Sequence, residues 1–189
     1  MFDEDKVGGA LLTKKKYAYI EKKVVDLYIE LTLSTHPLNP FSIAKGCGYI
    51  VLPYSSLCDE AVNLLREKEL DGFSCFNQTD RLHYIYYDDR EVIARQYFTV
   101  MHEIGHIRLG HKEDSALADK EADYFAAYSL APSPIMEIYK CEDFIDIMVL
   151  FGVSEPCAVR CFDRFIKWEL YSGRLKDYEK RLLNLFERN

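Results

Sequence analysis

Apolar residues recur at helical spacing near the start of the chain. Between residues 13 and 33 they are separated by steps of three and four, and lysines occupy the opposite side. Such spacing places one stripe of side chains on one face of an α-helix, so it predicts an amphipathic helix here. The run His36-Pro37-Leu38-Asn39-Pro40 then ends this helix, because proline lacks a backbone donor and restricts the residue before it.

Short apolar and aromatic runs predict a few strands. The segment 48–53 (GYIVLP) is typical of a buried strand, and segments 73–76 and 82–87 form a pair rich in aromatic residues. Ser56-Leu57-Cys58-Asp59 resembles a capping box, which predicts a second helix that ends near Lys68.

Helical patterns dominate the second half of the chain. They predict a helix over 90–110, another over 115–130, and further helices around 134–150 and 155–188. We therefore expect an α+β fold, in which a small antiparallel or mixed sheet packs beside a helical core and the C-terminal portion is helical.

The predicted helix 90–110 carries the sequence His102-Glu103-Ile104-Gly105-His106, a match to H-E-x-x-H. Residues four apart lie on one face of a helix, so both imidazoles can present a ring nitrogen to one metal ion. Zinc suits neutral imidazole, and a catalytic zinc site has three protein ligands and a water. Glu103 can reach that water and act as its general base. The spacing therefore predicts a zinc-dependent hydrolase.

The surroundings of this motif favour a metal site over two surface histidines. Apolar residues flank the pair, so the helix is expected to be buried, and buried polar groups are costly without a partner. Gly105 lies between the ligands, where glycine costs a helix about 1 kcal/mol relative to alanine. Close approach of another element or of a substrate would explain it.

A third ligand is needed. A metzincin would have a histidine at position 112, but that residue is Lys112 and the histidine is His111. If the next helix returns antiparallel, a rise of about 1.5 Å per residue brings Glu121 level with His106. Glu121 also shares a face with apolar residues that suit packing on the histidine helix. We therefore predict Glu121 as the third ligand.

Two further residues are candidates for supporting roles. Asp119 and Asp123 each lie two residues from Glu121, about 200° around the helix, so both are expected to point elsewhere. Asp123 is nevertheless the substitute candidate, as an outer hydrogen-bond acceptor for a ligand histidine. His111 either faces the helix dipole at a helix C-terminus or lines the cleft.

The composition limits the binding partners and the cellular location that we expect for this protein. The chain has 189 residues, 49% of them hydrophobic and 29% charged, and a net charge of −7. This negative charge disfavours direct nucleic-acid binding. The sequence contains no transmembrane segment, and its start does not resemble a secretory signal. The six cysteines include no CxxC pair, so we expect free thiols and a cytoplasmic location.

Three blocks of the chain together resemble one family. Residues 95–106 (RQYFTVMHEIGH) are similar to the R-x-x-F-T-x-x-H-E-x-G-H motif of ImmA/IrrE-type metallopeptidases. Residues 121–127 resemble that family's E-A-x-x-F-A-A segment, and Leu130 and Pro132 resemble the leucine and proline that follow it. Residues 151–160 resemble its F-G-V-S stretch and arginine. One departure is Ala131, where family members usually have methionine.

This resemblance implies a gluzincin-like zinc site of His102, His106 and Glu121, with Glu103 as general base. It also implies a protein substrate, a helix-turn-helix repressor of a mobile element or stress response. We accordingly divide the chain into an N-terminal helix (1–35), a zincin-like metallopeptidase core (36–133) and a helical C-terminal subdomain (134–189). The strand over 82–87 is a candidate for pairing with an extended substrate, unless it is purely structural.

A second functional class stays open. The protein would then be a non-catalytic, zinc-containing regulatory module that binds a repressor or DNA through its C-terminal helices. Residues 157–189 carry eight basic and five acidic side chains, a local excess of positive charge, and Phe151-Gly152-Val153-Ser154 fits the turn of a helix-turn-helix. The intact Glu103 favours the peptidase, because zinc binding alone does not require it.

Overall fold

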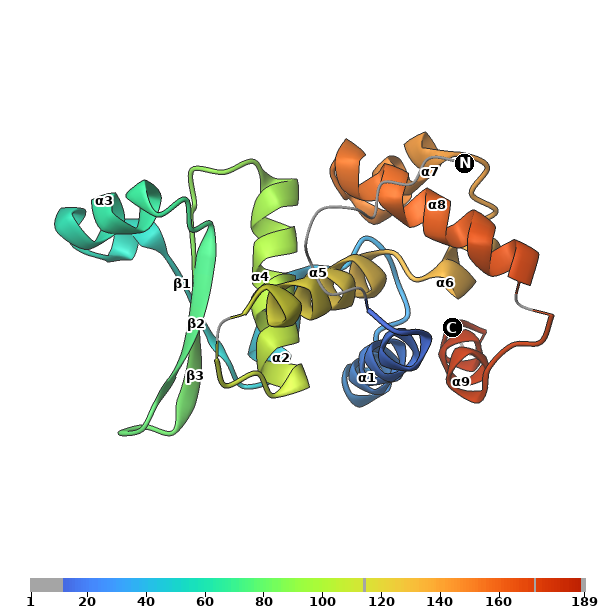
Figure 1. Ribbon diagram of the computed structural model, residues 1–189, viewed down its shortest axis with the longest axis horizontal. Coiled ribbons are helices and arrows are strands. Elements are labelled where there is room, and N and C mark those ends of the chain that lie inside the picture. The colour runs from blue at the N-terminus through green and yellow to red at the C-terminus, as the bar shows by residue number, and fades with distance from the viewer. Residues whose placement is uncertain (1–11, 114, 172, 188–189) are drawn as a thin grey trace.

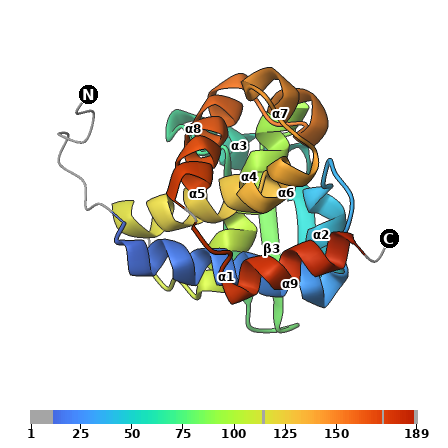
Figure 2. The same cartoon turned by 90° about the vertical axis from the view of Figure 1, so that its right-hand side faces the viewer.

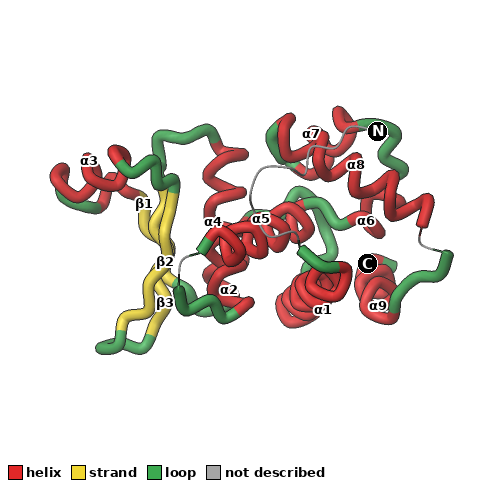
Figure 3. The backbone as a smooth tube through the Cα atoms, in the orientation of Figure 1, coloured by secondary structure: helices red, strands yellow, loops and turns green. Residues whose placement is uncertain are grey.

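A small sheet lies at one end of the molecule, and helices make up most of the rest (Figures 1 and 3). The computed structural model describes residues 12–113, 115–171 and 173–187. The predicted α+β class with its mixed sheet and helical C-terminal portion is confirmed. No helix within the described ranges has both the length and the apolar character needed to cross a membrane.

The sheet has three strands in the order β1-β3-β2. β1 (Ile50–Pro53) pairs with β3 (Leu82–Tyr87) in parallel, and β2 (Gly72–Asn77) pairs with β3 in antiparallel orientation. The central strand β3 is therefore paired on both sides, and the expectation that it could pair with a substrate is wrong. β2 is an edge strand instead.

The histidine helix and its successor meet at the centre of the fold. α4 (Ile93–Leu109) ends at Gly110, which adopts a left-handed conformation, and α5 (Ala116–Leu130) begins at Ser115, whose side chain caps it. In two perpendicular views α5 crosses α4 rather than returning alongside it (Figures 1 and 2). The antiparallel return that was used to choose the third ligand is thus wrong.

The first predicted helix is α1 (Lys14–Leu31), and it packs against α5 and α9 (Asp177–Phe186) (Figure 2). α1 ends before the prolines, at Thr32, which adopts a left-handed conformation. The proline-containing run that follows helps to begin a helix that we did not predict, α2 (Pro40–Gly46). Asn39 caps α2 and Pro40 occupies its first turn, where the missing donor costs nothing.

The capping-box prediction before the next helix is wrong. α3 (Asp59–Glu67) begins after Cys58, whose side chain makes no capping hydrogen bond. Ser56 belongs to a short 3₁₀ turn and donates its hydroxyl to the Pro53 carbonyl at 2.6 Å. A local partner in the turn thus competes with the helix for this side chain.

Each of the two helices predicted after Pro132 is divided in the structure. The first gives α6 (Ser133–Ile138) and α7 (Phe144–Phe151), separated by Lys140 in a left-handed conformation and by the cap residue Asp143. The second gives α8 (Glu155–Tyr171) and α9. Turn residues thus end a helix even where the apolar residues keep their helical spacing across the turn.

Candidate metal centre

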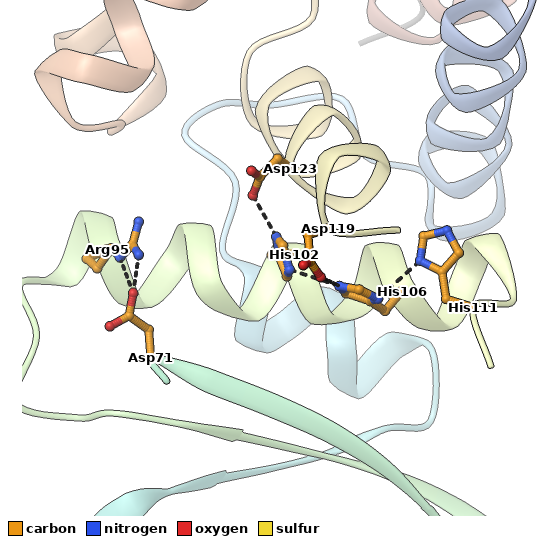
Figure 4. A network of polar contacts seen from close by, with 7 residues as sticks. All are labelled: Asp71, Arg95, His102, His106, His111, Asp119 and Asp123. Carbon is orange, nitrogen blue, oxygen red and sulfur yellow. Dashed lines mark hydrogen bonds and ion pairs between the residues drawn. The ribbon is translucent and has the colours of Figure 1, made fainter. Parts of the chain in front are cut away.

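His102 and His106 lie on one face of α4 and point toward each other (Figure 4). Their Nε2 atoms are 2.9 Å apart, and the side chains are 20% and 14% exposed. The helical spacing of four residues produces this arrangement, so the prediction that the two rings share a face is confirmed.

The cluster matches the donor set of a zinc ion. At Zn–N distances of 2.0–2.1 Å, tetrahedral geometry separates two ligand nitrogens by about 3.3 Å, close to the observed separation. The Oδ1 atom of Asp119 lies 3.6 Å from Nε2 of His106. One donor atom from each of His102, His106 and Asp119 falls within 4.8 Å of the other two. Two imidazoles and one carboxylate could therefore hold zinc here.

The expectation that Asp119 and Asp123 point away from the histidines is wrong. Both carboxylates face the pair, Asp119 beside His106 and Asp123 beside His102 (Figure 4). The physical reason is that α5 crosses α4. The face of α5 that meets the histidines is therefore different from the face that would meet them if the two helices were parallel or antiparallel. Residues 119 and 123 are four apart, so they share that face as the two histidines share theirs.

Glu121, the predicted third ligand, lies outside this cluster. Its Oε1 atom accepts a 2.8 Å ion pair from Lys16 Nζ, and its Oε2 atom lies 3.2 Å from Nε2 of His111. Burial alone would raise the pKa of the Glu121 carboxyl group, but its bonds with Lys16 and His111 outweigh burial and lower the pKa. Glu121 is thus a charged carboxylate with two partners already in place.

Asp123 orients His102. Its Oδ1 atom is 2.8 Å from Nδ1 of His102, so a proton on Nδ1 can be donated to the carboxylate while Nε2 faces His106. Burial alone would lower the pKa of His102, but the bond to Asp123 and the negative charge of Glu103 raise it above its ordinary value. A carboxylate behind a ligand histidine is the usual way to fix its tautomer.

His111 lies behind His106. Its Nδ1 atom is 3.1 Å from Nδ1 of His106, and the residue also lines the cleft. Of the two alternatives for this residue, the structure supports the position in the cleft.

A large open cleft, about 2050 Å³ in volume, passes over these residues. Glu103 is only 7% exposed but lines it, next to His102 and His106. The edge strand β2 contributes Gly72, Phe73 and Ser74 to another part of the wall. Glu103, the histidine pair and an edge of the sheet that is unpaired among the described residues therefore share one cavity.

Two contacts hold β2 against α4. Nε of Arg95 donates a 2.7 Å bond to Oδ2 of Asp71, just before the strand (Figure 4). A Cβ atom at Gly72 would lie 2.4 Å from Cγ2 of Thr99, so only glycine allows this approach. No local sequence pattern predicts that Asp71 and Gly72 pack beside the histidine helix.

Comparison with known protein families gives a match over part of the chain. Residues 63–160, which are 98 of the 189 residues, match the IrrE N-terminal-like domain family of peptidases (Peptidase M78). A search of curated proteins found no match to the chain. The family assignment supports peptidase chemistry and implies a metal. On the strength of this match over half its length, the chain belongs to the IrrE N-terminal-like domain family.

Proposed function

We propose that the protein is a zinc-dependent endopeptidase that hydrolyses peptide bonds in a specific protein. One observation carries this proposal: two imidazole nitrogens and one carboxylate oxygen converge in an open cleft beside a buried glutamate. In this proposal His102, His106 and Asp119 hold the metal, and Asp119 replaces Glu121 as the third ligand. Asp123 and His111 act as outer hydrogen-bond partners.

Each side chain then has a defined task. When bound, zinc supplies Lewis-acid chemistry, since it polarises carbonyl oxygens and lowers the pKa of water to about 7. Glu103 removes a proton from the attacking water and delivers it to the departing amine. The low exposure of Glu103 suits this role, because bulk water has little access to the carboxylate that has to take the proton.

The shape of the cleft favours a polypeptide substrate over a small molecule. The edge strand β2 borders the cleft with one side unpaired in the sheet, so an extended segment can add to it through backbone hydrogen bonds. The cleft is open to solvent, so an extended polypeptide segment can enter it.

We further propose that the substrate is a helix-turn-helix repressor of a mobile element or stress response, as the family resemblance implies. The six cysteines are all free thiols, which supports action in a reducing cytoplasm.

The test is metal analysis of the purified wild type and Glu103→Gln, followed by incubation of each with a helix-turn-helix repressor from the same genome. Mass spectrometry of the products identifies any cleaved bond. We expect stoichiometric zinc in both proteins and cleavage by the wild type alone, because an amide cannot take the proton. Zinc in both with binding but no cleavage would instead support the non-catalytic regulatory module.

A further inference from the structure

We propose that helix α1 is part of the metal centre, because Lys16 acts through Glu121 and His111 to position His106. This inference rests on the proposed zinc site but concerns residues that do not touch the metal. Lys16 lies outside residues 63–160, the part of the chain that matches the family. The N-terminal helix would therefore contribute to metal binding in addition to the matched domain.

Three successive contacts connect α1 to the ligand histidine. Nζ of Lys16 is 2.8 Å from Oε1 of Glu121. Oε2 of the same carboxylate is 3.2 Å from Nε2 of His111. Nδ1 of His111 is 3.1 Å from Nδ1 of His106. Each contact uses a different atom, so all three can exist at once.

One arrangement of protons satisfies all three of these contacts. The Lys16 ammonium group donates to Glu121, and the other oxygen of that carboxylate accepts from Nε2–H of His111. Nδ1 of His111 is then an acceptor, and it receives the proton on Nδ1 of His106. This arrangement places the lone pair of His106 on Nε2, the atom that faces His102. The contacts thus select the His106 tautomer that can bind a metal.

Burial makes these contacts stronger than surface ion pairs. The side chains of Glu121 and His111 are 6% and 13% exposed, whereas that of Lys16 is 39% exposed. A buried carboxylate requires partners, and hydrogen bonds in a medium of low dielectric constant are electrostatically stronger than those in water. The series therefore runs from a partly exposed lysine to a largely buried imidazole.

Lys16 is placed by the structure around it. Its backbone N–H donates to the Thr13 hydroxyl that caps α1, at 3.2 Å. The ring of the next residue, Tyr17, meets Tyr124 of α5 edge-on, with the ring centroids 4.5 Å apart. These contacts dock the first turn of α1 on the helix that carries Glu121. The ion pair is thus a consequence of packing between α1 and α5.

The first experiment measures zinc dissociation constants by competition with a chromophoric chelator, using the full chain. We expect His111→Ala and Glu121→Ala each to weaken zinc binding 10–100-fold, the range for loss of outer hydrogen-bond partners. Lys16→Met should weaken it several-fold. Lys15→Met is the matched control, since Lys15 is exposed and forms no ion pair with any described residue, and it should change nothing.

A double-mutant cycle tests whether Lys16 acts through Glu121. Lys16→Met should have no further effect on zinc affinity when Glu121 is already alanine. Equal effects of Lys16→Met in both backgrounds would overturn the proposed route. If Glu121→Ala does not fold, Glu121→Gln keeps the side-chain volume and replaces it in the cycle.

Nitrogen NMR of the histidine rings provides a readout that a general loss of stability would not change. In wild type, His111 should carry its proton on Nε2 alone, and in Glu121→Gln it should populate both tautomers. A single unchanged tautomer in the variant would contradict the inference.

The failures of the two proposals are distinguishable. A wild type that binds no zinc would overturn the proposed function and this inference together. A wild type that binds zinc as tightly as His111→Ala would overturn only the inference.

Discussion

Phe125 of α5 packs directly on Gly105 of α4, between the two histidines of the metal centre. A Cβ atom at Gly105 would lie 3.1 Å from Cδ1 of Phe125 and 3.2 Å from its Cβ. This glycine therefore permits close contact between the helices, which the sequence suggested without naming the partner. Phe125 is two residues from Asp123 on α5, so this contact helps to set how far the α5 carboxylates stand from the imidazoles.

Gly105→Ala should destabilise the protein and weaken zinc binding. Phe125 is fully buried and has little room to move, so the added methyl group should cost about 1–3 kcal/mol through overpacking. A gain in helix propensity of about 1 kcal/mol offsets part of this cost. Urea denaturation and zinc titration measure both effects. The double variant Gly105→Ala/Phe125→Leu should recover part of the loss, and no recovery would contradict the packing argument.

Asp119→Ala should abolish stoichiometric zinc binding, because it removes the carboxylate oxygen that lies 3.6 Å from Nε2 of His106. The loss of affinity should exceed the 10–100-fold effect expected for Glu121→Ala. Zinc content after gel filtration, together with chelator competition, measures the difference. If Glu121→Ala has the larger effect, the ligand predicted from the sequence is correct and Asp119 is not the third ligand.

Asp123→Asn should keep zinc but weaken its binding about 10–100-fold, since an amide is a poorer acceptor for the His102 proton than a carboxylate. Asp163→Asn is a suitable control. Asp163 also lines the cleft, but no ion pair links it to another residue in the described part of the chain. Equal zinc affinities for Asp123→Asn and the control would exclude an orienting role for Asp123.

Asp88→Asn should lower stability in a pH-dependent way. Arg66 donates two bonds to the largely buried Asp88, at 2.8 and 2.9 Å. The bonds with Arg66 are the main reason that the pKa of Asp88 is lowered from its ordinary value of 3.8. The stabilisation is therefore present at neutral pH and is lost as the pH falls through that lowered pKa.

Hydrogen bonds to charged groups contribute about 1.5–3 kcal/mol, so Asp88→Asn should cost a comparable amount at pH 7. Urea denaturation at pH 7 and at acidic pH measures the cost at each condition. The difference from wild type should shrink at acidic pH, and a constant difference would rule out this origin. Glu67→Gln, an exposed neighbour without an ion pair in the described residues, serves as the control.

Local sequence patterns determined several elements of this protein and two residues of its proposed metal centre. Amphipathic spacing identified α1, α4 and α5, and the spacing of four residues alone brought His102 and His106 together. These features depend on backbone geometry within a single helix, which is the same wherever the helix lies. The family motifs likewise consist of residues that are close in sequence.

Only the tertiary structure decided which residues join the histidines. The spacing of Asp119 and Asp123 is itself informative, because two acids four residues apart on one helix can face two histidines four residues apart on another. Choosing them over Glu121 required the crossing of α5 over α4, and that depends on packing at contacts such as Gly105 and Phe125. Strand order likewise placed β2, and not β3, at an edge of the sheet. Side-chain spacing fixes a face within one helix, whereas the relation between two elements depends on packing between residues distant in the chain.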